Sequence, residues 1–403
     1  MADQTLLLAN AILKEDYLGP IRSQLNVSTP VLQRLVKNTR DIVGKEAWIP
    51  LEMALNQGSG ARRESAILPS AGRTDWKEAK VELAHYYGAM SVTGPVMRQT
   101  AKGDRGSFGR IVDLEAKAMK RTLALNLAHD FYLGHKLAGV TTQGPVTVLQ
   151  LDSLANMEYF EVGMIVDVIV AATGVAVANG DSVTISAVNR TLSQITISGA
   201  GVTVVAGTHI VVREDTYNAT VNGLFTIVDD VLSLHGIDPA LFPRWAASVN
   251  AAFGAFTVSK LQIEIDRVVV ASGKYPTAIY GDYTRQRKYF ETLTANPQYV
   301  AIGNGGPKTM DGGFRTLEYS GGGSPIPWIA DRLMQSGSLL VLHEPDLQVY
   351  TPADFAFLEI GGDAWLPDIL GSSAVDRYKA ILWRDIQLGA MARNSHAKLL
   401  AIT

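Results

Sequence analysis

A glycine-rich segment is the first place in this chain to look for chemistry. Residues 303–313 read GNGGPKTMDGG. A phosphate-binding loop needs backbone N–H groups and a glycine directly before its lysine. Here Pro307 stands before Lys308, and proline has no N–H to offer a phosphate. We therefore interpret the segment as a surface loop.

Serine and histidine motifs for hydrolysis or zinc binding are incomplete. Ser324 follows two glycines but lacks the closing glycine of a nucleophile elbow. His343 and Glu344 are followed by proline, without the second histidine of a zinc-protease helix. His129 and His135 are six residues apart and would lie on different faces of a helix, which makes a shared metal ion improbable.

The remaining charged groups favour solvation over catalysis. Asp229 with Asp230 is interpreted as a turn, and Glu264 with Asp266 as a helix surface. A further charged group, Arg62, Arg63 and Glu64, is either solvated or in contact with a neighbouring subunit. We find no catalytic, cofactor-binding or metal-binding constellation, and we expect no enzymatic activity and no cofactor.

Composition narrows the class of protein. The 403 residues include 36 basic and 39 acidic side chains, a net charge of −3, whereas a dedicated nucleic-acid-binding protein usually has a basic excess. There is no cysteine, which excludes disulfides and thiolate metal sites. No export signal or 18-residue apolar run is present, so we expect no membrane segment.

The element that must organise the chain is a long helix predicted from Ser107 to about Gly139. Apolar residues recur there at steps of three or four, and Gly134 or Gly139 can end the helix. Asp104 or Ser107 can cap its start. A helix of this length indicates a scaffold more than a pocket.

Before this helix the sequence predicts an arm and a hairpin. Residues 1–45 contain two short helical patterns, one with Pro30 at its first position. Residues 46–93 are predicted to form one long hairpin, whose return limb places Val81, Leu83, His85 and Tyr87 on a single face. Such a two-stranded ribbon is marginal alone in water and needs a partner surface.

After the helix, residues 145–213 contain short strand-like runs separated by glycines, a pattern typical of a small antiparallel barrel or sandwich. The change in composition on both sides suggests an insertion. Residues 214–300 return to mixed structure, with a capping box at Ser259–Gln262 before a helix. Residues 314–360 are again strand-like, and Ala397–Ile402 can form a closing strand.

In this order of elements the chain resembles tailed-bacteriophage major capsid proteins of the Hong-Kong-97-type fold, an α+β fold. The resemblance covers nearly the whole chain except residues 145–213. The segments that carry it are ANAILKEDYLGPIRSQL, KEAKVELAHYYGAMSVTGPVMRQTAKGDRGSFGRIVDLEAKAM, PIPWIADRLMQSGSLLVLHEPDLQVYTP and YKAILWRDIQLGAMARNSHAKLLAI.

The resemblance implies a division of the chain. The expected parts are an N-arm (1–45), an extended β-hairpin loop on a neighbouring subunit (46–93), spine helix and peripheral domain (94–144), an inserted β-domain (145–213), an axial domain (214–313), peripheral-domain strands (314–375) and a C-terminal strand returning to the axial domain (376–403). Intersubunit contacts are expected from Arg62, Arg63, Glu64 and Arg73.

The function implied is self-assembly into hexamers and pentamers of an icosahedral shell that encloses double-stranded DNA. The implied partners are further copies of the chain, a portal protein, a separate scaffolding protein or none, and DNA held without sequence specificity. The implied location is the virion, with assembly in the host bacterial cytoplasm. The alternatives are a nanocompartment shell that packages enzymes, a hydrolase or transferase with an inserted β-domain, and a β-rich adhesin or tail component.

Some relatives join a loop lysine to a distant asparagine. In this chain residues 51–75 contain arginines but no lysine. We therefore expect no autocatalytic isopeptide bond.

Overall fold

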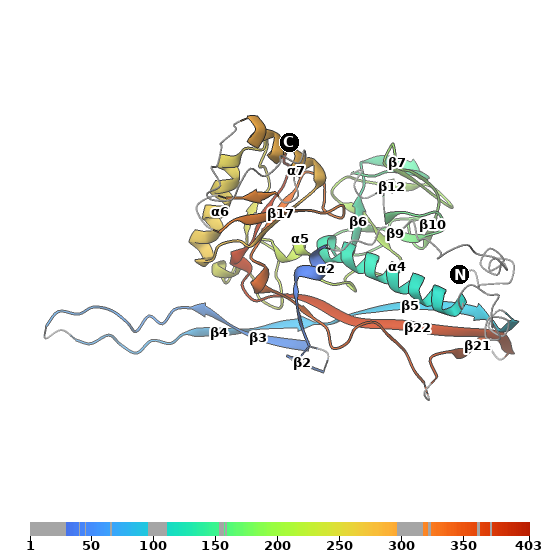
Figure 1. Cartoon of the computed structure of the whole chain (residues 1–403), viewed down its shortest axis with the longest axis horizontal. Coiled ribbons are helices and arrows are strands. Elements are labelled where there is room, and N and C mark those ends of the chain that lie inside the picture. The colour runs from blue at the N-terminus through green and yellow to red at the C-terminus, as the bar shows by residue number, and fades with distance from the viewer. Residues whose placement is uncertain are drawn as a thin grey trace, which may run out of the picture.

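The computed structural model describes residues 30–39, 41–44, 46–64, 67–95, 111–152, 157, 159–295, 317–320, 324–360, 363–370 and 373–403. Its long axis is a ribbon of strands, above which stand two lobes (Figure 1). The candidate caps at Asp104 and Ser107, the first helical pattern of the arm and the glycine-rich loop at 303–313 lie outside the described residues.

The longest strand, β22 (Ser373–Ala390), is the axis of the first sheet. It pairs antiparallel with β5 (Ala84–Thr93) over ten residues, from Arg377 opposite Thr93 to Ile386 opposite Ala84. Along its length β22 also pairs with three shorter strands, and one of them, β19, carries a strand from the arm in parallel. These smaller members are β1 (Val36–Asn38), β19 (Leu347–Tyr350), β20 (Ala356–Phe357) and β21 (Leu366–Leu370).

The predicted long helix is confirmed as α4 (Ile111–Leu133), and it ends at Gly134, whose φ is +65°. Leu123, Leu127 and Phe131, which share the predicted apolar face, are buried. The helix lies directly on β5, because a Cβ at Gly88 would come within 2.8 Å of Leu123 and Met119. No helix within the described ranges is both long and apolar enough to cross a lipid bilayer.

The hairpin is shorter than the sequence predicts. Strand β3 (Glu46–Ala54) pairs with β4 (Asp75–Glu82) and, at its start, with β2 (Ile42–Val43). The chain then passes Leu83 and enters β5, which pairs with β22 instead.

The single alternating face predicted for the return limb is therefore wrong. Val81 and Leu83 are buried as expected, but Ala84 is buried next, and His85 and Tyr87 are exposed. The alternation changes phase at Leu83 because the strands on either side of it belong to different sheets, β4 pairing with β3 and β5 with β22.

A second six-stranded sheet has the order β6-β13-β9-β10-β11-β8, with antiparallel pairing throughout. A bridge between Val140 and Leu151 joins the residues that directly follow β6 and β8, the two ends of this sheet. Its strands, with the separate pair β7 and β12, are β6 (Lys136–Gly139), β7 (Gln143–Val146), β8 (Val148–Gln150), β9 (Ile165–Val170), β10 (Val183–Asn189), β11 (Gln194–Ile197), β12 (Val202–Val204) and β13 (His209–Arg213). They enclose a hydrophobic cluster of their own.

The third six-stranded sheet has the order β14-β23-β18-β15-β17-β16 and forms the other upper lobe with α6 and α7 (Figure 1). Its elements are β14 (Ser248–Asn250), α6 (Val258–Ser272), β15 (Ala278–Gly281), α7 (Tyr283–Ala295), β16 (Glu318–Tyr319), β17 (Ile326–Ala330), β18 (Leu339–Leu342) and β23 (Ala397–Leu399). Short helical turns complete the chain at α2 (Pro30–Arg34), α5 (Leu224–Ile227), η2 (Pro243–Trp245), η3 (Glu344–Asp346) and η4 (Arg393–Ser395).

Two details of this lobe differ from the sequence predictions. The capping box at Ser259 is wrong, because α6 begins after Thr257, whose hydroxyl accepts a hydrogen bond from the Lys260 amide. Strands β16, β17 and β18 belong to the same sheet as β15 and β23. The sequence analysis had placed them with the later strands up to residue 375. Strand pairing joins residues far apart in sequence, so composition along the chain does not reveal it.

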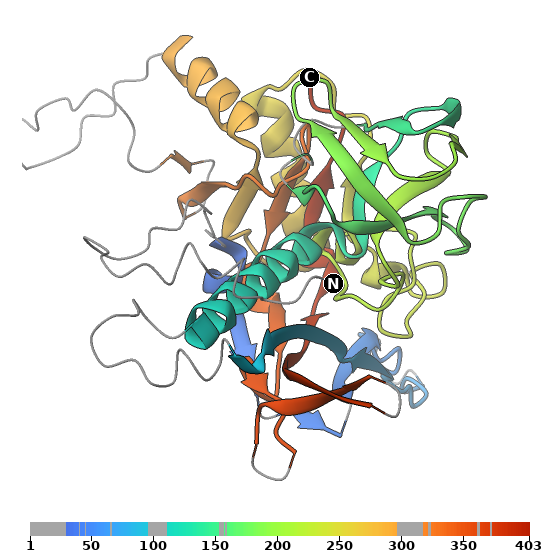
Figure 2. The ribbon, with the colours of Figure 1, turned by 90° about the vertical axis from the view of Figure 1, so that its right-hand side faces the viewer.

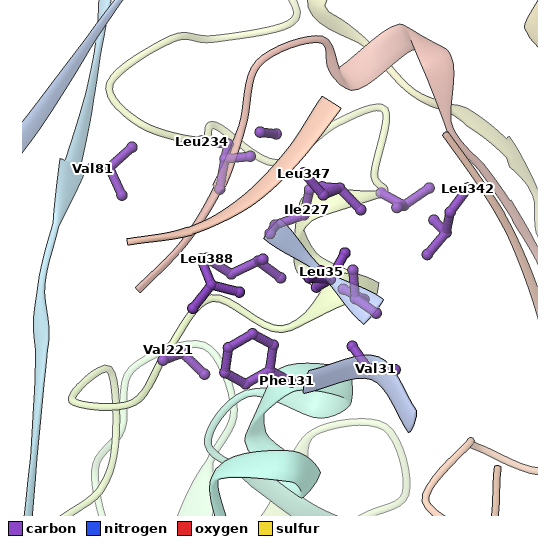
Figure 3. Packing of buried hydrophobic residues seen from close by; sticks show 14 of the residues in the cluster. Val31, Leu35, Val81, Phe131, Val221, Ile227, Leu234, Leu342, Leu347 and Leu388 are labelled. Atoms are coloured by element: carbon purple, nitrogen blue, oxygen red, sulfur yellow. The ribbon is translucent and has the colours of Figure 1, made fainter. Parts of the chain in front are cut away.

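The main core lies where the ribbon, α4, α5 and the arm meet. Figure 3 shows Val31 and Leu35 of the arm close to Phe131 of α4 and Leu347 of β19, with Leu388 of β22 nearby. The described part of the arm therefore buries Val31 and Leu35 against other parts of the chain.

Two buried histidines in this fold are held neutral. His396 is fully buried beside β18, and burial lowers its pKa to about 3. His235 is 8% exposed, and burial lowers its pKa to about 4. Nε2 of each has no hydrogen-bond partner among the described residues, so protonation would place an uncompensated charge in the interior.

The fold should therefore lose stability in mild acid. An unfolded histidine binds a proton below about pH 6.5, whereas these two do not, so their stabilising contribution is complete above that pH and falls as pH decreases toward the folded pKa values. We expect the urea midpoint to fall between about pH 7 and about pH 5, and His396→Gln to reduce that fall. Equal midpoints across this range would contradict the assignment.

Candidate functional site

The two histidines considered as metal ligands do not meet. His129 is fully buried, with its Nδ1 3.1 Å from Oδ1 of Asp130, and its ring packs edge-on against Tyr159. His135 instead packs against Tyr217, with ring centroids 4.9 Å apart. Among the described residues, no group of three or more His, Asp or Glu side chains is arranged to hold a metal ion.

Asp130 is the centre of a buried polar network that fastens α4 to two sheets. Arg213 of β13 donates to it at 2.9 Å, and the Tyr86 hydroxyl of β5 donates at 2.9 Å. Burial alone would raise the pKa of Asp130, but the Arg213 guanidinium and the His129 hydrogen bond hold it below its usual value. All four side chains are occupied with one another, which is a structural role.

The other carboxylates considered for acid–base chemistry are occupied in the same way. Asp229 accepts from Lys398 at 2.7 Å and from the amides of Val231 and Leu232. Glu264 accepts from Asn250 and Arg267, while Asp266 accepts from Gln262. Each of these carboxylates is engaged in a hydrogen bond or an ion pair within the fold.

Glu344, considered with His343 for zinc, ties the arm to the body. Arg34 of α2 donates to both of its oxygens, at 2.7 and 2.8 Å, and the Tyr280 hydroxyl donates at 2.6 Å. Burial would raise the pKa of Glu344, but the hydrogen bond from Arg34 lowers it below its usual value. Ser324 is exposed, and its two preceding glycines lie outside the described residues.

The feature without an internal explanation is the β3–β4 hairpin, which protrudes far from the body (Figure 1). Its inner face, including Ile49 and Val81, is buried in the main core near the root. Its outer face carries Trp48, which is 46% exposed and lies under the Lys80 ammonium, and Trp76, which is 61% exposed.

Further along the hairpin the apolar exposure increases. Leu55, Ile67 and Leu68 are 58%, 91% and 79% exposed. Burying such side chains is worth about 1.5–3 kcal/mol each. The sequence analysis missed these residues, although two tryptophans at outward positions and the run Ala-Ile-Leu-Pro in an otherwise polar loop are a usable signal.

The four residues expected to make intersubunit contacts all lie on this hairpin. Arg62, Arg63, Glu64 and Arg73 are exposed. The Arg62 guanidinium donates to the neighbouring carbonyl of Ala61, at 3.1 Å. Their position leaves them accessible, and their role as contacts stays a prediction.

The view along the ribbon completes the geometry. In Figure 2, α4 crosses the centre, the β5 and β22 strands lie below it, and the lobe of α6 and α7 stands on the opposite side from the β6–β13 sheet. The hairpin thus continues the ribbon layer, and its outer part extends beyond both lobes (Figure 1).

Comparison with solved structures gives this arrangement a context. The cyanophage A-1(L) capsid asymmetric unit matches with a TM-score of 0.56 and 13% identity, over 99% of this chain and all of that one. The capsid of a native GTA particle matches with a TM-score of 0.52 and 10% identity, over the full length of both chains. The chain has the capsid fold of the Hong-Kong-97 type. The α+β class predicted from the sequence is confirmed with it.

This capsid fold is found without any signal from sequence comparison. No protein-family model matches the chain, and no curated protein is significantly similar to it. At 10–13% identity the similarity concerns the path of the backbone, and it includes the ribbon and α4 because both matches cover essentially the whole chain.

The buried network of the capsid fold can be tested at Arg213, whose side chain is 16% exposed against 1% for Asp130. Arg213→Met should cost roughly 3–5 kcal/mol of unfolding free energy, because it leaves the buried Asp130 carboxylate without its cation. Urea unfolding at neutral pH measures the loss. Adding Asp130→Asn should restore most of it, and a single variant as stable as the parent would contradict the role of the pair.

Proposed function

We propose that this chain is a major capsid protein that assembles into hexamers and pentamers of an icosahedral shell around double-stranded DNA. The observation that carries the proposal is the protruding hairpin on a chain that has the capsid fold from end to end. This hairpin exposes four large apolar side chains, those of Trp48, Ile67, Leu68 and Trp76, that no described part of the chain covers.

The energetics of the hairpin support an obligate assembly. A two-stranded ribbon is marginal in water, and exposed tryptophan and leucine side chains gain free energy only when another surface covers them. Because every copy carries the same hairpin, a head-to-tail contact repeats around a ring until it closes. The large, apolar interfaces that result are typical of obligate assemblies.

We also propose the division of the chain that the resemblance implies, with two refinements. The axial domain would include β16, β17 and β18, since these strands belong to the same sheet as β15 and β23. The inserted β-domain would be a barrel closed at the Val140–Leu151 bridge, and it would include β6, whose Leu137 belongs to the same cluster. Arg62, Arg63, Glu64 and Arg73 would contact a neighbouring subunit.

The proposed role is structural, without catalysis. Asp130, Asp229, Glu264 and Glu344 are engaged in ion pairs, and His129 and His135 pack against tyrosine rings. The shell would be part of a virion, assembled in the bacterial host cytoplasm, with a portal protein and a separate scaffolding protein as further partners. Its net charge of −3 suits a wall that holds DNA without gripping it strongly.

Mass and shape in solution test the proposal. The full chain, purified and examined by light scattering and negative-stain microscopy, should form closed shells or rings of five and six copies. A stable monomer or dimer under every assembly condition would contradict it. Shells that carry enzyme cargo and no DNA when isolated from their native host would replace it with the nanocompartment alternative.

A further inference from the structure

A groove lies beside the hairpin, between the second half of β3 and the end of α6. It has a volume of about 580 Å³, and Pro50, Leu51, Glu52 and Met53 of β3 line one wall. Trp245 of η2 and Met391, which directly follows β22, belong to its other walls.

Consecutive residues of a strand point to opposite faces, so four in a row can line one groove only if the strand presents its edge to it. One edge of β3 pairs with β4 from Glu46 to Ala54. On the other edge β2 reaches only Glu46 and Ala47 among the described residues. The edge from Trp48 onward therefore faces the groove without a strand beside it.

Pro50 is consistent with this position. Proline within a sheet is confined to edges and bulges, because it cannot donate to a ladder on its free side. A long open edge is also a template for pairing with another chain, unless it is covered or blunted. Pro50 limits the length of any added strand but leaves Leu51 to Ala54 available.

The groove has a mixed lining that suits a polypeptide backbone. Glu52, Arg244 and Asn394 line it together with Leu51, Met53 and Met391, of which Met391 is 39% exposed. Trp245 is 3% exposed, and its indole Nε1 is buried with no hydrogen-bond partner among the described residues. An unpaired buried donor costs about 1–3 kcal/mol, which a carbonyl entering beside it would offset.

We propose that this groove receives an extended segment of a second copy of the chain, which pairs with the open edge of β3 and packs its side chains against Met53 and Met391. The occupant is a second copy because Pro50 and Glu52 of the groove wall lie on the same exposed face of β3 as Trp48, which the proposed function places under a neighbour. A neighbour that covers Trp48 on β3 also reaches the edge of the same strand. This inference rests on the proposed function.

Cysteine accessibility tests the groove, since the native chain has no cysteine. Ala271→Cys places a thiol in the groove wall at an exposed position near the end of α6, and Val175→Cys places a reference thiol at a 63% exposed position in the β6–β13 region. Both thiols should react quickly with a maleimide in the unassembled protein. In particles assembled from the purified chain, the thiol at 271 should react roughly tenfold more slowly.

The outcomes separate the two proposals. Equal reactivity at 271 before and after assembly would overturn the groove proposal alone. Protection that appears only when a different protein is added would also overturn it, because the occupant would not be a second copy. If the parent chain never assembles, the proposed function fails instead. Met391→Cys provides a second groove thiol should the first variant not fold.

Discussion

The ten-residue ladder between β5 and β22 is the interaction on which the rest of the structure depends. It gives α4 a flat surface, and Gly88 allows the helix to lie directly on it. The same strand β22 carries β19, and β19 carries β1 of the arm. Because β5 follows β4 after a single residue, Leu83, the ladder also holds the root of the hairpin. Loss of this register would separate the arm, the helix and the hairpin at once.

In the resulting structure the buried charged side chains hold segments of the chain together, and large apolar side chains are exposed on the hairpin. Asp130, Asp229, Glu264 and Glu344 each hold two segments or a loop in place through short hydrogen bonds. The outer tryptophans of the hairpin and the apolar residues near its tip are exposed in a single copy. A shell protein needs both features. The internal ion pairs keep each subunit rigid, and the exposed apolar side chains supply the contacts between subunits.

Sequence periodicity could predict the elements whose structure is local. The spacing of Leu123, Leu127 and Phe131 predicts α4, and a glycine after it predicts the end. Strand pairing could not be predicted, because β5, the partner of β22, is nearly three hundred residues away and the sequence of β22 does not indicate which strand it pairs with. The change of face at Leu83 has the same origin, and so does the place of β16 to β18 beside β15. Trp48 and Trp76 became recognisable only when the exposed faces of their strands were known.

The central claim is that a neighbouring copy covers the hairpin, and oxidative footprinting of the tryptophans tests it most directly. In the unassembled chain Trp48 and Trp76 should oxidise quickly, while Trp328, which is 4% exposed, should react slowly and serve as the internal control. In assembled particles both hairpin tryptophans should become protected roughly tenfold, because a neighbour buries them. Particles in which Trp48 and Trp76 remain as reactive as in the free chain would contradict the account.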